Sequence, residues 1–550
     1  MKIAAGKSIL DRIGIGKIRI YKAPSYEISD RTVKDPEAEL KRFDAALQKA
    51  IGQQDILYEK AKAEVGEENA EIFEAHRMML EDEDLQGVTR EIIREKKKSA
   101  EFAVKTAFDT YAQFFAELED PYMQARSVDL IDIGNTVLDI LTGSDPGSIQ
   151  GTEPCILVAD DLTPSETVRL DKSLLLGIIT REGSANSHTA ILARSMNLPA
   201  LIQCRDVDDS WDGRMAILDG YNGCVYIDPD PDLLESMKKK YDAVLKEDEL
   251  LQELRGRTGT TIDGRRIIIA ANIGGPSDLG SVLANDAEGV GLFRSEFLYL
   301  NSKGEPTEEQ QFAAYRRVVE TLAPALVIMR TCDLGADKTV DYLNLEEEEN
   351  PALGFRAIRI CLTRKDFFKK QLRAMLRASA YGSMGIMFPM ITSRWEVIEA
   401  KKILEECKEE LRREGHRIGN FQTGIMVETP AAVFVADDLA EEVDFFSIGT
   451  NDLLQYTCAI DRQNEKLERF TDMHHPAVLR AIKMTVDAGH RHGIWVGICG
   501  ELGADPALTE TFLRMGVDEL SVNAGSVLPL RRLVRSLDLS GAPEWSPEEV

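Results

Sequence analysis

Reactive side chains stand just after apolar runs at five places in the second half of the sequence. The runs at residues 290–293, 327–329, 425–427, 446–449 and 496–498 lead into Arg294, Arg330, Glu428, Asn451 with Asp452, and Cys499. The carboxyl ends of parallel strands meet at one edge of a sheet or barrel, which is where active sites are assembled. We therefore expect these side chains to share one site.

The residue types at these strand ends suit a small anionic substrate. Arginine guanidinium groups are planar forks that bind phosphate and carboxylate oxygens. Four occur on the strand ends or on the loops that follow: Arg294, Arg330, Arg356 and Arg462. Glu428 and Asp452 supply hard oxygen ligands of the kind that Mg²⁺ takes while it keeps waters and substrate oxygens. This half of the chain is thus predicted to bind a multiply anionic phosphate compound through a metal ion and several arginines.

A histidine in a turn of small residues is the candidate nucleophile. His188 follows the segment 183–187 (Gly-Ser-Ala-Asn-Ser) and opens a helical stretch that runs to Arg194. A phosphate formed on it would lie near the positive amino end of that helix. One ring nitrogen of imidazole is unprotonated near neutral pH and can attack phosphorus. From this spacing alone, a histidine that only caps the turn is the alternative.

The elements that carry the strand-end residues predict a barrel over residues 261–550. Apolar strands are expected at residues 267–272, 290–294, 326–330, 386–390, 424–428, 445–449, 494–499 and 519–522, with amphipathic helices between them. Eight strand–helix units are what a (β/α)8 barrel of the TIM type requires. Strand patterns alone leave an open, doubly wound sheet as the alternative.

The first 230 residues predict an α/β domain that holds a helical insert. Short apolar runs at residues 155–159, 174–179 and 215–218 suit buried strands and share their character with the strands of the first twenty residues. Between them, residues 36–142 show apolar positions at helical spacing, which predicts four helices with breaks near Gly66, Gly87 and Pro121. A charged helix from Pro231, within a linker at residues 231–260, is expected to join this domain to the barrel.

The helical insert contains an acidic segment at residues 67–84. Eight carboxylates stand there against one arginine, Arg77. Such a run is either a solvated helix face or a surface that binds a partner. The four acids that we take for the partner surface are Glu67, Glu68, Glu71 and Glu74.

The composition excludes several classes of protein. The net charge of −28 and the isoelectric point near 4.8 disfavour nucleic-acid binding, because such a chain repels phosphate backbones. The eight cysteines form no C-x-x-C motif, so neither a zinc ribbon nor a disulfide framework is indicated. No apolar run approaches the length of a membrane helix, and the start lacks the apolar core of a signal peptide. We expect a cytoplasmic protein without membrane insertion.

Six motifs resemble the enzyme I family of the phosphoenolpyruvate-dependent sugar phosphotransferase system. They lie at residues 183–194, 288–298, 330–338, 350–356, 448–453 and 498–501. The helical segment at residues 71–83 also resembles that family's phosphocarrier-binding subdomain. One departure is the segment before His188, where the family usually reads Gly-Gly-Arg-Thr-Ser. The resemblance spans nearly the whole chain.

The resemblance implies an activity and a role for each candidate residue. His188 would take the phosphoryl group from phosphoenolpyruvate and pass it to a histidine of the phosphocarrier protein HPr, with release of pyruvate. Cys499 would protonate the enolate. The substrate would be bound by Arg294, Arg330, Arg356, Asn451, Asp452 and Arg462, and Mg²⁺ by Glu428 and Asp452. The family is a homodimer joined through its barrels, and its phosphohistidine domain swivels between barrel and carrier.

Three other functions can be compared with this one. A pyruvate phosphate dikinase or phosphoenolpyruvate synthase shares the phosphohistidine and barrel modules but carries a large nucleotide-binding domain before the histidine, for which the 187 preceding residues leave no room. The nitrogen-regulatory paralogue has an additional amino-terminal sensor domain. A non-catalytic scaffold that binds a partner through the acidic helices would be expected to lack part of the metal and arginine set, which is complete here.

Overall fold

The computed structural model describes residues 1–546 except 24–25, 27, 66, 118–120, 145–148, 150, 184–186, 301, 303, 336–337, 339, 347 and 462–463. The chain forms two compact units, Met1–Lys246 and Glu247–Val550. The boundary between them falls within one helix, α8 (Pro231–Gln252). Of the helices in the described residues, none is both long and apolar enough to cross a membrane.

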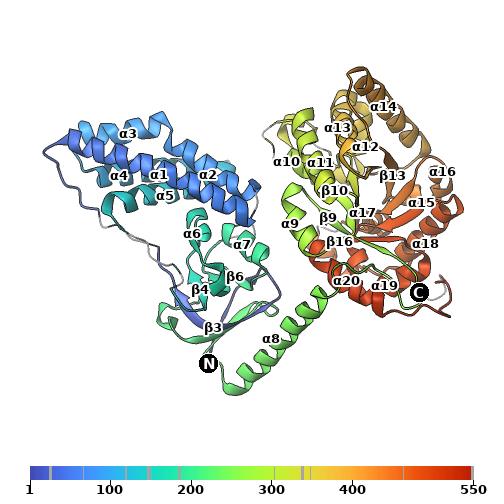
Figure 1. Ribbon diagram of the computed structural model, residues 1–550, viewed down its shortest axis with the longest axis horizontal. Helices are drawn as coiled ribbons and strands as arrows, with labels where there is room; N and C mark the ends of the chain where they lie inside the picture. The colour runs from blue at the N-terminus through green and yellow to red at the C-terminus, as the bar shows by residue number, and fades with distance from the viewer. Residues whose placement is uncertain are drawn as a thin grey trace. The chain divides into compact units, whose positions relative to one another are not determined.

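An eight-stranded sheet forms the base of the first unit. Its order is β1-β8-β7-β3-β4-β5-β6-β2, with β3 to β6 parallel to one another and the remaining strands antiparallel to their neighbours. Strands β3, β4 and β6 of this sheet are labelled in Figure 1. The strands are β1 Lys2–Ala5, β2 Lys7–Ser8, β3 Ile13–Ile20, β4 Cys155–Ala159, β5 Leu175–Thr180, β6 Ala200–Ile202, β7 Met215–Asp219 and β8 Cys224–Ile227. All five residues of β4 are buried, as expected for a central parallel strand covered on both faces. The chain leaves this sheet after β3 and returns to it at β4, so the helices between them are an insert.

The helical insert contains five helices where the sequence predicted four. They are α1 Pro36–Val65, α2 Glu67–Leu80, α3 Glu83–Arg94, α4 Ala100–Ala116 and α5 Pro121–Thr142. The predicted break at Gly87 is wrong, because that glycine lies within α3. The chain instead breaks where Asp82 and Ser99 cap new helices, their side chains accepting hydrogen bonds from the backbone N–H groups of Leu85 and Phe102. The predicted breaks near Gly66 and Pro121 agree with the end of α1, the start of α2 and the start of α5, and the two boundaries of α3 that the sequence missed are set by polar caps.

Two short helices of the α/β part, α6 (Pro164–Arg169) and α7 (His188–Met196), follow strands β4 and β5. The backbone N–H of Ser165, in α6, donates to Asp132 Oδ2 of α5 at 3.1 Å, which ties the insert to the sheet domain. Ser187 caps α7, its hydroxyl accepting from the N–H of Ala190 at 3.3 Å. The candidate nucleophile, His188, is therefore the first residue of α7.

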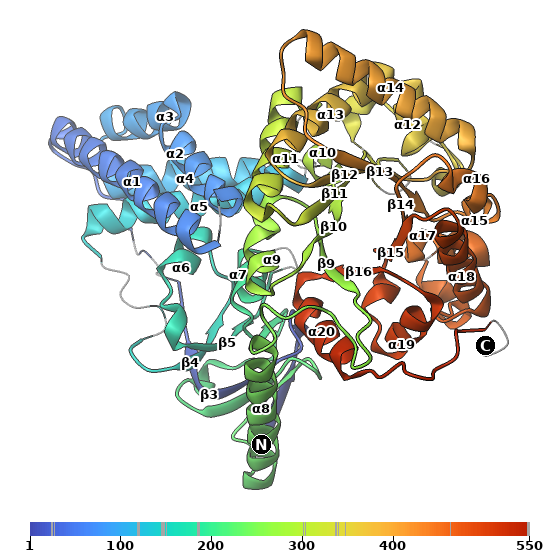
Figure 2. The ribbon, with the colours of Figure 1, turned by 45° about the vertical axis from the view of Figure 1, so that its right-hand side comes forward.

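A closed barrel of eight parallel strands forms the second unit, which confirms the predicted TIM-type fold (Figure 2). The strands are β9 Ile268–Ile273, β10 Gly289–Arg294, β11 Leu326–Arg330, β12 Met384–Phe388, β13 Phe421–Val427, β14 Phe445–Ile448, β15 Trp495–Ile498 and β16 Glu519–Asn523. The last strand pairs in parallel with the first, from Glu519 opposite Ile268 to Asn523 opposite Asn272. That pairing rules out the open sheet.

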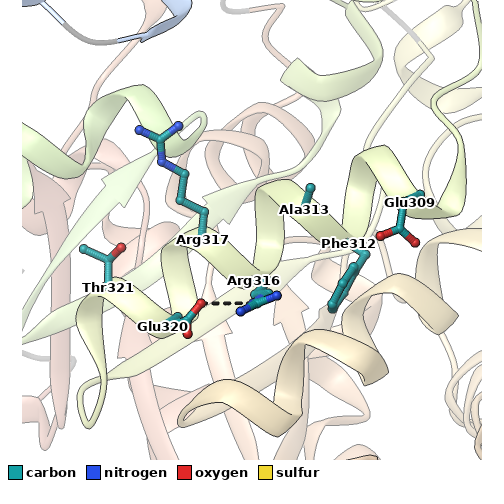
Figure 3. Close-up of a pocket in the computed structure, with 7 residues that line it drawn as sticks. All are labelled: Glu309, Phe312, Ala313, Arg316, Arg317, Glu320 and Thr321. Atoms are coloured by element: carbon teal, nitrogen blue, oxygen red, sulfur yellow. Dashed lines mark hydrogen bonds and ion pairs between the residues drawn. The ribbon is translucent and has the colours of Figure 1, made fainter. Parts of the chain in front are cut away.

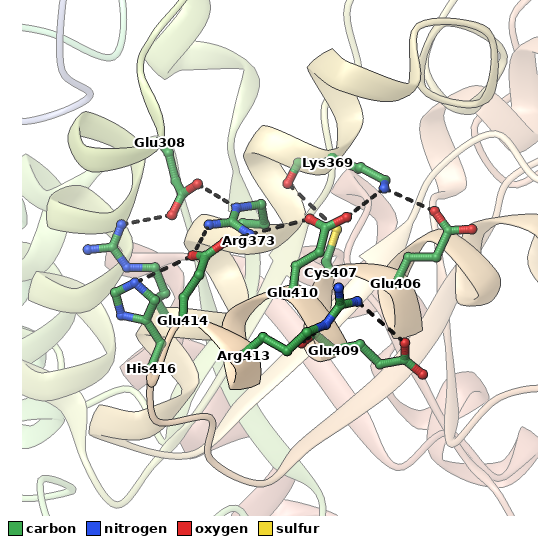
Figure 4. A network of polar contacts seen from close by, with 11 residues as sticks. Glu308, Lys369, Arg373, Glu406, Cys407, Glu409, Glu410, Arg413, Glu414 and His416 are labelled. Atoms are coloured by element: carbon green, nitrogen blue, oxygen red, sulfur yellow. Dashed lines mark hydrogen bonds and ion pairs between the residues drawn. The ribbon is translucent and has the colours of Figure 1, made fainter.

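Helices surround this barrel on the outside. They are α9 Leu279–Ala284, α10 Glu296–Leu300, α11 Glu308–Leu322, α12 Ile358–Thr363, α13 Lys365–Ala378, α14 Arg394–Arg413, α15 Pro430–Phe434, α16 Ala436–Ala440, α17 Thr450–Cys458, α18 Pro476–Arg491, α19 Pro506–Met515 and α20 Val527–Ser536. Ion pairs join three of them (Figure 4): Arg373 of α13 binds Glu308 of α11 at 2.7 Å and Glu414, just after α14, at 2.6 Å. Half-exposed pairs of this kind add modestly to stability.

A carboxylic acid, Glu519, is buried inside the barrel with one oxygen that no described residue hydrogen-bonds. Glu519, the first residue of β16, is 2% exposed, and its Oε1 has no hydrogen-bond partner among the described residues. Two glycines make room for it, since a Cβ at Gly291 would lie 2.4 Å from Oε1 and one at Gly497 3.4 Å from it. Burial, with Glu288 and Asp518 nearby, raises the pKa of Glu519 to about 8.

Replacing Glu519 by Gln should remove a pH dependence of barrel stability. Because the folded-state pKa of this acid lies above its unfolded value, ionisation favours unfolding, and this group should lower wild-type stability between about pH 4.5 and 8 by roughly 1.4 kcal/mol per pH unit. In urea unfolding of the barrel, Glu519→Gln should lower the slope by about 1.4 kcal/mol per pH unit, because Glu428, whose pKa is also raised by burial, still contributes. The exposed control Glu249→Gln should keep the wild-type slope. Equal slopes in wild type and Glu519→Gln would contradict a neutral buried acid.

Candidate functional site

The carboxyl ends of the barrel strands bring most of the predicted second-half residues together. Arg294 and Arg330 are partners in register at the ends of β10 and β11. Glu428 follows β13, and Cys499 follows β15, where its backbone N–H donates to the carbonyl of Ile448 at 3.1 Å. The strand ends therefore form one cluster, as the sequence predicted.

Arg330 is held by two buried carboxylates. It is 5% exposed, and its Nη1 lies 3.0 Å from Asp333 Oδ2, while its Nη2 bonds Glu296 Oε1. Lys338 lies beside the same two acids, with its Nζ 2.9 Å from Glu296 Oε1 and 3.5 Å from Asp333 Oδ2. Charge-assisted bonds away from water fix the direction of the guanidinium group.

Arg356, which lies in a loop, also binds Asp333. Its Nη2 donates to Asp333 Oδ1 at 2.9 Å, and its Nη1 donates to the hydroxyl of Tyr456 at 3.0 Å. Gly335 permits this approach, because it has φ +106° and a Cβ there would lie 2.5 Å from Arg356 Cβ. Asp452 Oδ2 is 3.9 Å from Arg356 Nη2. Arg356 thus connects the β11 loop to α17.

Glu428 and Asp452 form a buried pair of carboxylates that fits a divalent cation. Glu428 is 1% exposed and Asp452 8%. Glu428 Oε1 accepts the N–H of Met390 at 2.6 Å, and a Cβ at Gly449 would lie 2.7 Å from its Oε2. Burial first, and then the Asp452 charge, raise the pKa of Glu428 to about 8, although Arg330 and Arg356 oppose the shift. The described residues contain no cluster of three or more His, Cys, Asp or Glu side chains able to hold a metal.

Cys499 is a buried thiol in the barrel interior. It is 1% exposed and packs among apolar side chains that include Leu292, Ile328 and Met426. Burial raises the pKa of Cys499 to about 11, although Arg330 and Arg294 oppose the shift. The sulfur therefore carries a proton at neutral pH, which a general acid needs.

The other predicted barrel residues differ in how far their side chains are engaged. Arg294 is partly buried, and among the described residues no ion pair or hydrogen bond engages its guanidinium group, which leaves it available to a substrate. Both polar atoms of the Asn451 side chain are bonded to Glu501, Nδ2 to Oε1 at 2.9 Å and Oδ1 to the backbone N–H at 3.0 Å. Arg462 lies outside the described residues.

The predicted residues of the first unit are described mainly by their backbone. His188 begins α7, but its side chain is outside what the structure describes, as are those of Glu67, Glu68 and Glu71 in α2. Glu74, one turn further along α2, is exposed. The structure therefore assigns these residues to helices without testing their contacts.

Sequence reasoning missed several groups that hold the site together. Three of these groups lie within the motifs quoted above but were not predicted as site residues: Glu296, Asp333 and Lys338. Their position close in sequence to Arg294 or Arg330 could have indicated that they form ion pairs in the site. The N–H of Met390 carries no sequence signal at all. A surface hollow on α11 contains none of the predicted site residues (Figure 3); there Arg316 pairs with Glu320 at 3.0 Å.

Known proteins resemble this chain along its length. Three family models match: "PEP-utilising enzyme, N-terminal" over residues 5–126, "PEP-utilising enzyme, mobile domain" over 151–223 and "PEP-utilising enzyme, PEP-binding domain" over 248–539. A phosphoenolpyruvate-protein phosphotransferase of Listeria monocytogenes is 41% identical over 99% of this chain and 96% of its own. Proteins of the same name from Geobacillus stearothermophilus and Staphylococcus carnosus are 42% identical over 96% of this chain and 91% of their own, and 38% identical over 99% and 96%.

Adding a methyl group at Gly449 should weaken divalent cation binding. The new Cβ would lie 2.7 Å from Glu428 Oε2 and 3.0 Å from Glu428 Cβ, so the carboxylate must move. We expect Mg²⁺ to raise the wild-type melting temperature and Gly449→Ala to need at least about tenfold more Mg²⁺ for the same rise. The control Gly503→Ala, whose Cβ would meet nothing closer than 3.4 Å, should behave as wild type. An unchanged Mg²⁺ response in Gly449→Ala would remove Glu428 from the metal site.

Proposed function

This chain belongs to the phosphoenolpyruvate-protein phosphotransferase family, and we propose that it transfers the phosphoryl group of phosphoenolpyruvate to His188 and then to a histidine of the phosphocarrier protein HPr. The similarity to named relatives over nearly the full length of both chains carries this proposal. The cluster of arginines and carboxylates at the barrel strand ends supports it, because it provides what an anionic substrate needs.

The barrel would bind the substrate through the arginines. Arg294 and Arg330, in register on adjacent strands, would face the phosphate and carboxylate groups, with Arg356 beside them. Asn451 and Arg462 are proposed to complete the set. Bidentate guanidinium contacts align the phosphorus for attack and neutralise charge, and phosphoryl transfer needs little beyond those two effects.

Glu428 and Asp452 are proposed to hold Mg²⁺. Bound there, the cation would offset the negative charge of the substrate oxygens. The protein's own part is to keep two carboxylates in place: the N–H of Met390 orients Glu428, and Arg356 lies 3.9 Å from Asp452. Without a cation, burial and mutual repulsion favour the protonated form of Glu428.

The chemical step pairs a nucleophile from one unit with a site in the other. The unprotonated ring nitrogen of His188 would attack phosphorus, so that an N–P bond forms and the bridging P–O bond breaks, leaving the enolate of pyruvate. Cys499 would then give its proton to the methylene carbon, and solvent would reprotonate the thiolate. Since His188 precedes α8 in the chain and the barrel follows it, the two units must meet during turnover.

The acidic surface of α2 is proposed to receive the carrier. Glu67, Glu68, Glu71 and Glu74 lie within two turns of this helix, and Glu74 is exposed. Clustered carboxylates attract a basic partner and speed its encounter. The family resemblance adds that the protein works as a homodimer joined through its barrels.

Replacing His188 by Ala should abolish labelling from phosphoenolpyruvate. With Mg²⁺ and no nucleotide, we expect one acid-labile, base-stable phosphoryl group in the wild-type chain and none in His188→Ala, measured with ³²P-labelled substrate. His416→Ala, at an exposed histidine of the barrel unit, should label normally. Normal labelling of His188→Ala would overturn the assignment of the nucleophile, and a need for ATP would favour the dikinase class.

Replacing Cys499 by Ala should separate substrate binding from turnover. Arginines and metal supply the binding, so KM for phosphoenolpyruvate should stay within about threefold, while loss of the acid should lower the rate of pyruvate formation by about 10²-fold. Cys407→Ala removes an equally buried thiol on α14 and should leave both constants near wild type. Unchanged turnover in Cys499→Ala would make this cysteine a packing residue.

A further inference from the structure

Asp333 lies between the two buried arginines of the barrel site. It is 1% exposed, and each of its oxygens serves a different guanidinium group: Oδ1 accepts from Arg356 at 2.9 Å and Oδ2 lies 3.0 Å from Arg330. Arg330 and Arg356 are themselves only 5% and 4% exposed. Burial opposes ionisation of this acid, but the two arginines hold the pKa of Asp333 well below its ordinary value. The carboxylate is therefore charged at any pH at which the protein works.

This arrangement places the acid where an anionic ligand would otherwise bind. Two guanidinium groups that face one point in a dry pocket repel each other and form a strong site for any small oxyanion. Asp333 occupies that point. Glu296, which is also buried, forms ion pairs with Arg330 and with Lys338 and so offsets part of the remaining positive charge. Of the described arginines in this site, Arg294 is the one whose guanidinium group makes no hydrogen bond or ion pair with described residues.

We propose that Asp333 is a positioning and specificity-determining residue: it acts as an internal counter-anion that keeps Arg330 and Arg356 side by side while preventing the pair from capturing simple oxyanions. The outward faces of the two arginines then bind only a ligand that makes further contacts, such as a phosphorylated carboxylic acid that also reaches Arg294. The substrate named here rests on the proposed function, but the exclusion of simple anions does not depend on it.

The physical consequence is an opposite effect on two ligands. Without the negative charge, the pocket gains one unit of positive charge and the inner faces of the arginines become free. A simple oxyanion should then bind more tightly. The intended substrate should bind and react less well, because the two forks are no longer held in one geometry. General damage to the site would weaken both ligands.

The experiment uses the full chain with Asp333→Asn, which keeps the shape of the side chain and removes its charge. Inorganic sulfate binding, measured by calorimetry without Mg²⁺ or phosphoenolpyruvate, should become at least about tenfold tighter. With Mg²⁺, kcat/KM for phosphoenolpyruvate should fall by about 10²-fold. Asp286→Asn is the matched control, because Asp286 also bonds a buried arginine, Arg531 at 2.6 Å, outside the site; it should change neither value.

Two results would overturn the proposal: unchanged or weaker sulfate binding in Asp333→Asn, or tighter sulfate binding in Asp286→Asn as well. If Asp333→Asn does not fold, the same two measurements on Asp333→Glu test the proposal, since this variant keeps the charge and moves the carboxylate. It should exclude sulfate like the wild type while kcat/KM falls, and tighter sulfate binding there would equally overturn the proposal. Absence of any turnover in the wild type would count against the proposed function alone, because the sulfate measurement needs none.

Discussion

The barrel site depends on keeping several cations together in a buried place. Arg330 and Arg356 are almost fully buried, and Lys338 lies beside Arg330. Charges of one sign cannot share a dry pocket unless carboxylates lie between them. Asp333 and Glu296 are these carboxylates. Asp333 lies in the loop after β11, and Glu296 lies just after the end of β10. The closed barrel is what brings these separate segments to one rim.

In the proposed function, substrate binding and phosphoryl acceptance are divided between the two compact units of the chain. The substrate residues belong to the barrel, while His188 opens α7 in the unit that also contains the acidic helix α2. A phosphoryl group held on a side chain can be carried from one site to another without release into water. The proposed transfer to a carrier therefore requires the two units to move relative to one another.

Much of this architecture could be predicted because it depends on the local spacing of apolar and polar residues in the sequence. Apolar runs located all eight barrel strands to within a few residues, and they correctly placed Arg330, Glu428 and Cys499 at the carboxyl ends of strands. The number of helices in the insert was predicted as four instead of five, because Asp82 and Ser99 cap helices α3 and α4 at positions where no break was predicted. The support of the site was missed for a different reason: the Asp333–Arg356 contact joins residues 23 apart through an irregular loop, and Met390 acts through its backbone, which has no residue signature.

The most direct measurement is a crystal structure of the full-length His188→Ala variant with phosphoenolpyruvate and Mg²⁺, in which the missing nucleophile should leave the substrate intact. The account predicts the substrate at the carboxyl ends of β10 and β11, with its anionic groups on Arg294 and on the outward faces of Arg330 and Arg356, and with Asp333 still between those two arginines. A substrate inserted between Arg330 and Arg356 with Asp333 displaced, or bound away from these strand ends, would contradict it.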